Sequence, residues 1–548
     1  MPPLADEDYA DLLTHEIPSF DDPVIQKYLS SKQALILEEK KHFSDHSFRQ
    51  ALSPLAKKAC AIFDSLLSKE KEIPEPKDTK SYTILQLLPK GGLLNCHLHD
   101  LIDFTELAEL VIGTRGLFIS STTAQDGKGV SIKFFAKSRE EKEGWVRIDE
   151  AAKKFRQDDG VAGFLPWLRG LFFGGGEERS DGGSEEEEKD SAEMDSNSGE
   201  KILREVLYYE PIFRRALRRV FELMVLDGVL WGELRMTFPI QFYRENSETP
   251  EDENDYDYLF KVIREEVDKF RAGLISDQVF WGVRIIWSTT SEGVVDQRGL
   301  IQDMDDCITT KISHPDLVAG YDPSMVLARA SKEGWIIPCL FWFRKQCAQE
   351  DVQIPFLCGS VESDDNLFDT LLLGARRVWI KGGEEGRRIV MNNPKFLEAV
   401  KDKKILVGVE PAAIVPVWRR GRNSSITEAN TVGTISGLVA QGVCCAVGVG
   451  QERQLSRELW MMMMNGNKGE GGVDLATLGC MAENSVRWGV FEDLDGGSWT
   501  KEIREASVGD GTKAERLRKW AVEWERFCLC VVHEFGDEEE DVEVGGDD

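Results

Sequence analysis

Residues Leu88–Asp103 read LPKGGLLNCHLHDLID, and they contain the first of a series of short apolar segments. A Lys-Gly-Gly turn at 90–92 leads into the apolar segment Leu93–His99. A short apolar run bounded by turn residues is typical of a buried β-strand. Seven further segments of this kind follow along the chain: Leu230–Phe238, Phe280–Ser288, Asp316–Asp322, Ile354–Ser360, Arg377–Ile380, Ile405–Glu410 and Cys444–Gly450.

Helical patterns separate most of these eight strands. Ile212–Met224 precedes the second strand, and Asp365–Leu373 precedes the sixth. Strands that alternate with helices indicate a parallel sheet, and eight such units favour a closed ring. The sequence therefore predicts an α/β protein, a (β/α)₈ TIM barrel over residues 88–535.

Three segments stand outside this repeating pattern. Residues 1–87 carry apolar positions at helical spacing and are predicted to form an N-terminal helical extension. A hairpin, Gly116–Ser121 with Ser131–Ala136, is expected between the first two strands. The segment 174–200 and the tail 536–548 are too acidic and polar to pack, so a disordered insertion and a disordered tail are expected.

The charge of the chain is acidic but unevenly spread. The net charge is -30, and Glu177–Glu200 carries eleven acidic residues against two basic ones, while Glu534–Asp548 carries nine acidic residues and no basic one. Affinity for nucleic acid comes from Lys and Arg that displace counterions from phosphates. A body without a basic stripe therefore argues against a nucleic-acid partner.

The cysteines and the start of the chain bear on location. Eleven cysteines are scattered without a C-x-x-C pair, which argues against a disulfide framework. The start, MPPLADEDYA, has acids where a signal peptide has a basic region, and nowhere do eighteen apolar residues run together. We expect a cytoplasmic protein with no membrane partner.

The chain resembles the adenosine deaminase family, in particular the secreted-type branch of adenosine-deaminase-related growth factors and its fungal relatives. The resemblance starts in Leu88–Asp103 and recurs in order over roughly residues 20–535. The other stretches that carry it are WGELRMTF from Trp231, GVRIIWSTT from Gly282, PDLVAGYD from Pro315, DDNLFDTLLLGARRV from Asp364, GLVAQGV from Gly437, LGCMAENSVRW from Leu478 and WERFCLCVV from Trp524.

The resemblance implies a barrel that hydrolyses adenosine to inosine and ammonia, with a zinc ion that activates water. It implies zinc ligands from a His-x-His pair on the first strand, a His on the fifth and an Asp on the eighth. It also implies a proton-shuttling Glu three residues after the fifth-strand His, and a further His on the sixth strand. These groups sit at the carboxyl ends of barrel strands.

On the first strand, the family's two His positions fall on Asn95 and His97, and its substrate-side Asp falls on His99. Positions 95, 97 and 99 share one face of an extended strand, so a slip of two residues presents His97 and His99 as a pair. We keep His97 and His99 as candidate metal ligands of a remnant zinc site. The alternative is two histidines that are merely solvated or hydrogen-bonded.

On the fifth strand, the family's His-Ala-Gly-Glu falls on Leu357, Cys358, Gly359 and Ser360. Serine cannot replace a carboxylate as the proton shuttle, because its hydroxyl does not carry the charge that the mechanism uses. Cys358 is expected to point away from the face of Leu357, as a buried structural thiol.

On the sixth strand, Gly-His-Gly meets Trp379, Ile380 and Lys381, and on the eighth strand Ser-Asp-Asp meets Val449, Gly450 and Gln451. All seven histidines lie outside residues 315–532: His15, His42, His46, His97, His99, His314 and His533. No shift of register supplies an imidazole from the last four strands. We therefore assign no catalytic residue.

Several residues with other roles are also singled out. Gly320 and Asp322 match the fourth strand of the family, and Met325 stands where the family has a glycine, which predicts a narrower pocket. Glu233 and Arg235 match the second strand and are predicted to form a structural ion pair. Glu233, Glu362, Asp364 and Glu410 are the carboxylates expected near the site.

These observations leave three hypotheses for the function. The leading one is an adenosine-deaminase-like barrel that has lost catalysis, holds no cofactor and acts by binding a purine nucleoside, another small molecule or a protein. The alternative is an active metal-dependent deaminase or hydrolase with altered metal ligation on His97 and His99. A conventional zinc adenosine deaminase is least supported. The resemblance also implies a homodimer.

Overall fold

The structure is a computed structural model of the chain. It describes these residues: 18–70, 73, 76–120, 130–135, 144–155, 159–173, 196–252, 255–275, 278–289, 296–361, 363–410, 430–449, 455–465 and 473–536.

Eight parallel strands form the centre of the molecule, and each coincides with one of the eight predicted segments. Their residues are mostly buried, because both faces of the strands are covered. The strands are β1 (Gly91–His97), β5 (Val229–Phe238), β6 (Gly282–Thr289), β7 (Val318–Asp322), β8 (Leu357–Val361), β9 (Arg377–Lys381), β10 (Leu406–Glu410) and β11 (Cys445–Val447).

The strands are arranged in two halves that share one interior. One half has the order β1-β5-β6-β7 and the other β8-β9-β10-β11. A parallel bridge between Tyr321 and Phe356 joins β7 to the residue before β8. Side chains also connect the halves, since Asn95 of β1 contacts Glu410 of β10. The chain is thus an α/β fold of parallel strands, as predicted.

The edge between β1 and β11 is bridged by a helix. The paired residues of the described strands include no ladder between β1 and β11. Instead, α21 (Leu475–Arg487) lies beside both strands. The backbone N–H of Gly92 donates to Ser485 Oγ at 2.7 Å, and Asn484 Nδ2 donates to the Cys445 carbonyl at 3.1 Å. Side-chain hydrogen bonds therefore satisfy backbone groups at this edge.

The Lys-Gly-Gly motif before β1 is explained by its surroundings. Lys90 is buried, and its ammonium group donates to the carbonyls of Leu85 and Asp227. Gly91 has a φ of 69°, and a Cβ there would lie 2.4 Å from the carbonyl oxygen of Ala482. Only glycine fits a left-handed position so close to another backbone. The motif therefore fixes where the first strand begins.

Helices surround the strands, and several begin at a capping side chain. Asp296 accepts the N–H of Gly299 at 2.8 Å at the start of α13, and Ser363 accepts the N–H of Asn366 at 3.3 Å at the start of α16. The helices that follow the strands are α11 (Glu210–Leu226), α12 (Asp257–Ala272), α13 (Gln297–Ser313), α14 (Ser324–Ala330), α15 (Ile336–Gln349), α16 (Asp364–Leu372), α17 (Gly383–Asn392), α18 (Pro394–Lys403), α19 (Asn430–Ala440), α20 (Leu455–Asn465), α22 (Gly496–Glu505) and α23 (Thr512–Phe535).

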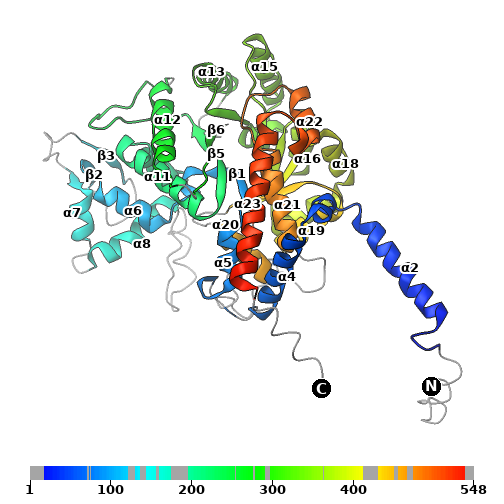
Figure 1. Cartoon of the computed structure of the whole chain (residues 1–548). Helices are drawn as coiled ribbons and strands as arrows, with labels where there is room; N and C mark the ends of the chain where they lie inside the picture. The colour runs from blue at the N-terminus through cyan, green and yellow to red at the C-terminus, as the bar shows by residue number, and fades with distance from the viewer. Residues whose placement is uncertain are drawn as a thin grey trace, which may run out of the picture.

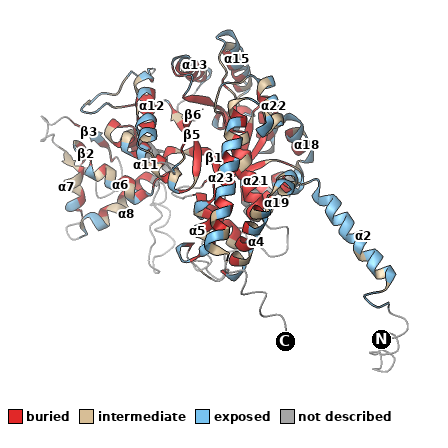
Figure 2. Ribbon diagram, in the orientation of Figure 1, coloured by how far each residue is buried: buried red, intermediate tan, exposed pale blue. Residues whose placement is uncertain are grey.

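The N-terminal extension is helical, as the spacing predicts. It contains α2 (Pro23–Lys40), α3 (His46–Ala51), α4 (Pro54–Lys69) and α5 (Lys80–Leu87). Helix α4 buries its apolar face and packs along the last helix, α23. Helix α2 has no buried residue and points away from the body of the molecule, as Figures 1 and 2 show.

An insertion between β1 and β5 forms a small subdomain at one side of the strands (Figure 1). The predicted hairpin is present as β2 (Leu117–Ser120) and β3 (Ile132–Phe134), which pair antiparallel. A third strand, β4 (Trp145–Arg147), pairs with β2 and was not predicted. The helices of the subdomain are α6 (Phe104–Gly113), α7 (Ile148–Lys153), α8 (Gly160–Phe173) and α10 (Ser196–Leu207).

The two predicted disordered segments fall almost entirely outside the described residues. Of the segment 174–200, residues 196–200 form the first turn of α10, so this end of the prediction was wrong. All eleven cysteines are free thiols. No helix among the described residues is long and apolar enough to cross a membrane.

Candidate functional site at the carboxyl ends of the strands

The inner face of the strands carries a polar cluster near their carboxyl ends. Side chains alternate between two faces of a strand, so residues two apart share a face. Arg235 of β5 contacts the side-chain oxygen of Asn95 on β1 and forms an ion pair with Asp322 of β7, with Nε 3.3 Å from Oδ2. Asn95, Arg235 and Asp322 are all buried. We call these three residues the mouth cluster.

Asp322 is the centre of the mouth cluster. One carboxylate oxygen accepts hydrogen bonds from the Gly359 N–H at 2.9 Å, the Ser324 N–H at 3.0 Å and the Ser324 hydroxyl at 2.6 Å. The other accepts the Ser288 hydroxyl at 3.3 Å. A carboxylate with this many donors is held in one position as an acceptor. Asp322 therefore fixes the ends of β6, β7 and β8 relative to each other.

Asn95 connects the mouth cluster to the opposite side of the interior. Its amide nitrogen donates to Glu410 Oε1 at 3.0 Å. Glu410 is the last residue of β10 and is partly exposed. Of the four carboxylates expected near the site, Glu410 is the one that the structure places there. Glu362 and the side chain of Asp364 lie outside the described residues, and Glu233 lies elsewhere.

The two candidate metal ligands do not share a strand. His97 is the last residue of β1 and is partly exposed. His99 lies beyond the strand, in the 3₁₀ helix η3 (Leu98–Leu101), and its side chain is outside the described residues. The predicted strand Leu93–His99 thus ends two residues early, so the period of two no longer relates His97 to His99. The pair as a zinc site stays a prediction.

Strand β8 presents apolar or small residues where the family has its zinc ligand and acid. Leu357 is on the inner face, since a Cβ on Gly320 would meet its side chain at 2.6 Å. Gly359 faces Arg235, whose guanidinium would lie 2.3 Å from a Cβ at that position. Cys358 is fully buried, and burial raises the pKa of its thiol well above the usual value. Metal ligation needs the thiolate, so this environment disfavours it.

A tryptophan fills the interior at the level of β9 and β10. Trp379 is 2% exposed. A Cβ on Gly408 would lie 2.1 Å from its ring, and one on Gly448 would lie 3.1 Å away. Trp379 stands where the family has the first glycine of its sixth-strand Gly-His-Gly, and the histidine position is taken by the buried Ile380. Met325, in contrast, is 49% exposed at the start of α14.

The residues at the mouth do not fit a zinc ion of the family type. Such a site needs imidazole, thiolate or carboxylate donors on several strands. Among the described residues, no group of three or more His, Cys, Asp and Glu side chains can hold a metal ion. Leu357 supplies no donor, and Asn95 uses its amide on Arg235 and Glu410. Val449 is buried, and residues 450 and 451 lie outside the described residues.

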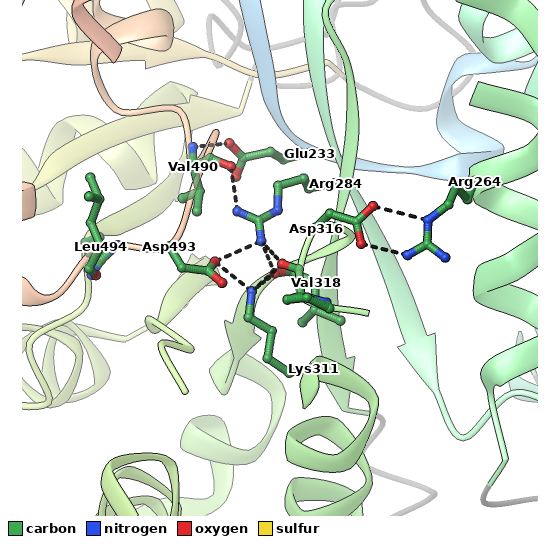
Figure 3. A network of polar contacts seen from close by, with 11 residues as sticks. Glu233, Arg264, Arg284, Lys311, Asp316, Val318, Val490, Asp493 and Leu494 are labelled. Atoms are coloured by element: carbon green, nitrogen blue, oxygen red, sulfur yellow. Dashed lines mark hydrogen bonds and ion pairs between the residues drawn. The ribbon is translucent and has the colours of Figure 1, made fainter. Parts of the chain in front are cut away.

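The amino ends of the strands carry a second buried network, which Figure 3 shows. Arg284 of β6 and Lys311 of α13 both donate to Asp493, at 2.9 and 2.7 Å, and both reach the Val318 carbonyl. Burial, together with repulsion from Arg284, lowers the pKa of Lys311 to about 8. This network holds the segment after α21 against the ends of β6 and β7.

Glu233 belongs to this second network and not to the mouth. It is fully buried, pairs with Arg377 of β9 and accepts the N–H of Val490 at 2.7 Å. Burial disfavours its charged form, but the Arg377 guanidinium outweighs burial and lowers the pKa of the carboxyl. The predicted ion pair between Glu233 and Arg235 was therefore wrong: each has a partner on another strand.

The sequence alone did not indicate what Asp322 and Trp379 do. Each has a signal in retrospect. Asp322 ends an apolar strand directly before a helix start, and Trp379 pairs across strands with Gly408, a residue without a side chain. Neither signal names the partner, because the contact depends on the register between strands.

No protein-family model matches the chain. Over 214 residues, 38% of its length, the chain is 25% identical to an adenosine deaminase of Lutzomyia longipalpis, and the match spans 38% of that protein. The chain is thus adenosine-deaminase-like over this stretch.

Two solved structures are less similar to the chain in sequence. An amidohydrolase from Burkholderia ambifaria with bound Zn is 14% identical, with a TM-score of 0.45 over 83% of this chain and 95% of that chain. Arabidopsis ADAL complexed with GMP is 14% identical, with a TM-score of 0.39 over 77% of this chain and 98% of that chain. No functional assignment rests on these two likenesses.

Proposed function

We propose that this chain is an adenosine-deaminase-like (β/α)₈ barrel that has lost deamination and acts by binding a small molecule at the mouth cluster. The stretches quoted from the sequence, in their order, support the family. The eight parallel strands and the side chains that connect the two halves support the barrel. The residues at the mouth argue against the deamination reaction.

The observation that carries the proposal is the set of side chains at the inner positions. The family mechanism needs a cation that poises hydroxide and a carboxyl group that moves the proton. Here those positions carry Asn95 and Leu357 in place of two histidines, Ser360 in place of the glutamate and Ile380 in place of the sixth-strand histidine. None of these groups ligates zinc or shuttles a proton near neutral pH.

What remains at the mouth is suited to recognition. Arg235 holds the Asn95 amide, Asn95 in turn holds the carboxylate of Glu410, and Glu410 is a partly exposed acceptor. A purine nucleoside offers ring nitrogens and sugar hydroxyls that match such groups. We propose this ligand class, in the cytoplasm, and a homodimer as the assembly. Binding of a purine nucleoside without deamination agrees with the polar side chains at the mouth and with the residues at the catalytic positions.

Metal content and ammonia release test the loss of catalysis together. Full-length protein is purified in the presence of zinc, its metal is quantified, and ammonia release from adenosine is followed. We expect less than stoichiometric zinc and no release above buffer. The matched comparison is the double variant His97→Ala/His99→Ala, which we expect to behave like the original protein in both assays.

Two outcomes contradict this proposal in different ways. Stoichiometric zinc that is lost in the double variant would support the alternative of an active hydrolase with altered ligation. Ammonia release at ordinary enzymatic rates would show that the protein is an active deaminase.

A separate experiment tests binding at the mouth. Calorimetry measures the affinity for adenosine and for inosine in the unmodified protein, in Glu410→Gln and in the surface control Glu398→Gln. An equal affinity in all three would remove the mouth as the site.

A further inference from the structure

A cavity lies away from the mouth, between the hairpin of the inserted subdomain and the segments that surround Tyr209 and Tyr243. It has a volume of about 240 Å³. One wall comes from the hairpin β2/β3, and the other comes from α10, the residue before α11 and the loop after β5. Tyr209 and Tyr243 are joined by a parallel bridge, so the second wall is fixed by backbone hydrogen bonds.

Aromatic rings form much of this cavity. Phe134 of β3 stacks on Tyr209, with ring centroids 4.7 Å apart and an interplanar angle of 24°. Tyr243 and Phe135 also line the cavity. Tyr209 is buried, and its hydroxyl accepts the N–H of Asn246 at 3.5 Å. Aromatic rings carry negative potential on their faces, so a cavity lined by several rings favours a positively charged ligand.

Carboxylates add to this negative potential. Glu205 of α10 and Glu248 of the loop after β5 both line the cavity, against one base, Lys133. Nearby carboxylates also raise the pKa of the two tyrosine hydroxyls in this cavity. Burial raises the pKa of Tyr209 to about 12, and Glu245 and Glu210 act in the same direction. Burial and Glu205 raise the pKa of Tyr243.

We propose that this cavity binds a small organic cation with an apolar body. Aromatic faces attract ammonium and guanidinium groups, and the carboxylates Glu205 and Glu248 provide the opposite charge. The volume limits the ligand to the size of a substituted amine or a single basic side chain, below the usual range of drug-sized pockets. The site is separate from the mouth cluster, so it does not depend on the function proposed there.

Phenethylamine tests the site, with phenethyl alcohol as its neutral counterpart of the same shape. Calorimetry on the full-length protein measures both affinities at low and at physiological salt. We expect the amine to bind at least about 5-fold more tightly than the alcohol, and the difference to shrink as salt screens the charges. Equal binding of the two compounds, or no binding of the amine at millimolar concentration, would overturn the proposal.

Two variants place the amine in this cavity. Glu205→Gln removes one negative charge from the cavity wall. We expect it to lower the affinity for the amine about 3- to 5-fold and to leave the affinity for the alcohol unchanged. Glu109→Gln removes the same charge from an exposed position on α6 and is the matched control, expected to leave the affinity unchanged. An equal effect of both variants would mean that overall charge attracts the amine, and the site would be rejected.

Phe134→Leu keeps an apolar wall but removes the stacked ring. We expect a loss of about 2- to 5-fold for the amine and a smaller loss for the alcohol. The melting temperature is recorded alongside, because Phe134 also packs against Tyr209. If the fold is impaired, Tyr209→Phe is the second variant, since it retains the ring and should retain affinity; a loss of amine binding there would contradict the role of the ring faces.

The source of the cation is distinguished by a third compound, a blocked arginine with both backbone ends capped. Preferential binding of phenethylamine would indicate a free amine as the natural ligand, and preferential binding of the blocked arginine would indicate a peptide side chain. Both results support an organic-cation site. Binding of neither compound would exclude it.

Discussion

At the amino ends of the strands, Arg284, Lys311, Arg377 and Glu233 are buried in a network that reaches the segment after α21. At the carboxyl ends, the mouth cluster uses the same inner face but has one acid and one base, Asp322 and Arg235, and Arg235 also contacts the Asn95 amide. In barrels, the amino end serves stability and the carboxyl end carries chemistry. In this molecule the amino end is held by a buried ionic network of several charged side chains, and the mouth cluster at the carboxyl end contains a single ion pair.

The largest expected effect concerns the pair at the amino end. Arg377→Met leaves Glu233 buried with its partner removed, so the free energy of unfolding should fall by about 3–5 kcal/mol. The matched variant at the carboxyl end is Arg235→Met. It leaves Asp322 with its backbone and hydroxyl donors, and we expect a smaller loss of about 1–3 kcal/mol. Urea denaturation measures the free energy of unfolding of both variants. Equal losses would contradict the difference between the two ends of the strands.

The second effect concerns the packing of Trp379. Gly408→Ala places a methyl group 2.1 Å from the indole ring, and overpacking of this kind costs about 1–3 kcal/mol. The control is Gly113→Ala, where a Cβ meets nothing within 4 Å. If Trp379 fills the interior as described, Gly408→Ala combined with Trp379→Leu should recover part of the loss. Purely additive losses would contradict a direct contact.

The third effect is a pH dependence at the amino end. Burial lowers the pKa of Lys513 to about 7, while Glu502 and Glu233 act in the opposite direction. The unfolded chain then binds more protons than the folded chain between pH 7 and the ordinary lysine pKa, so stability should rise with pH in that window. The slope contributed by Lys513 is at most about 1.4 kcal/mol per pH unit.

Lys513→Met should reduce this slope, and Lys519→Met, on the exposed side of the same helix, should leave it unchanged. Burial also lowers the pKa of Lys311 to about 8. Lys311 therefore contributes to the pH dependence of the unfolding free energy in both variants. Unfolding free energies measured at several pH values above 7 check the sign. A slope that is the same in Lys513→Met and in the unmodified protein would exclude the assignment.

The smallest effect is expected at Met325, where the sequence predicts a narrowed pocket. Met325 is half exposed, so Met325→Ala should change the free energy of unfolding by less than about 0.5 kcal/mol. The informative measurement is nucleoside affinity at the mouth. An affinity that increases in the variant would support the narrowing, and an unchanged affinity would place Met325 outside the site.

The strands were predictable because each is a short apolar run between turn residues. The same reasoning missed β4, because Trp145–Arg147 is too short and too mixed to stand out. It also extended β1 to His99, although the chain turns into η3 after His97. Where a strand ends depends on its neighbours, and β1 pairs with β5 only as far as His97.

The absence of an imidazole from the last four strands follows from a count, because residues 315–532 contain no histidine. The groups that stand there instead were not predictable. Trp379 meets Gly408 and Gly448, and Arg235 meets Gly359, through the relative register of different strands. The cavity at Tyr209 combines three distant segments, and no local pattern in any of them indicates a ligand.

Helix α2 has a practical consequence. Its eighteen residues include none that is buried. A protease that cuts at the end of α2 would release this helix without opening the rest of the molecule, since exposed elements with few buried contacts are cleaved first. Limited digestion should therefore yield a trimmed chain of unchanged melting temperature, unless a second molecule shields the helix.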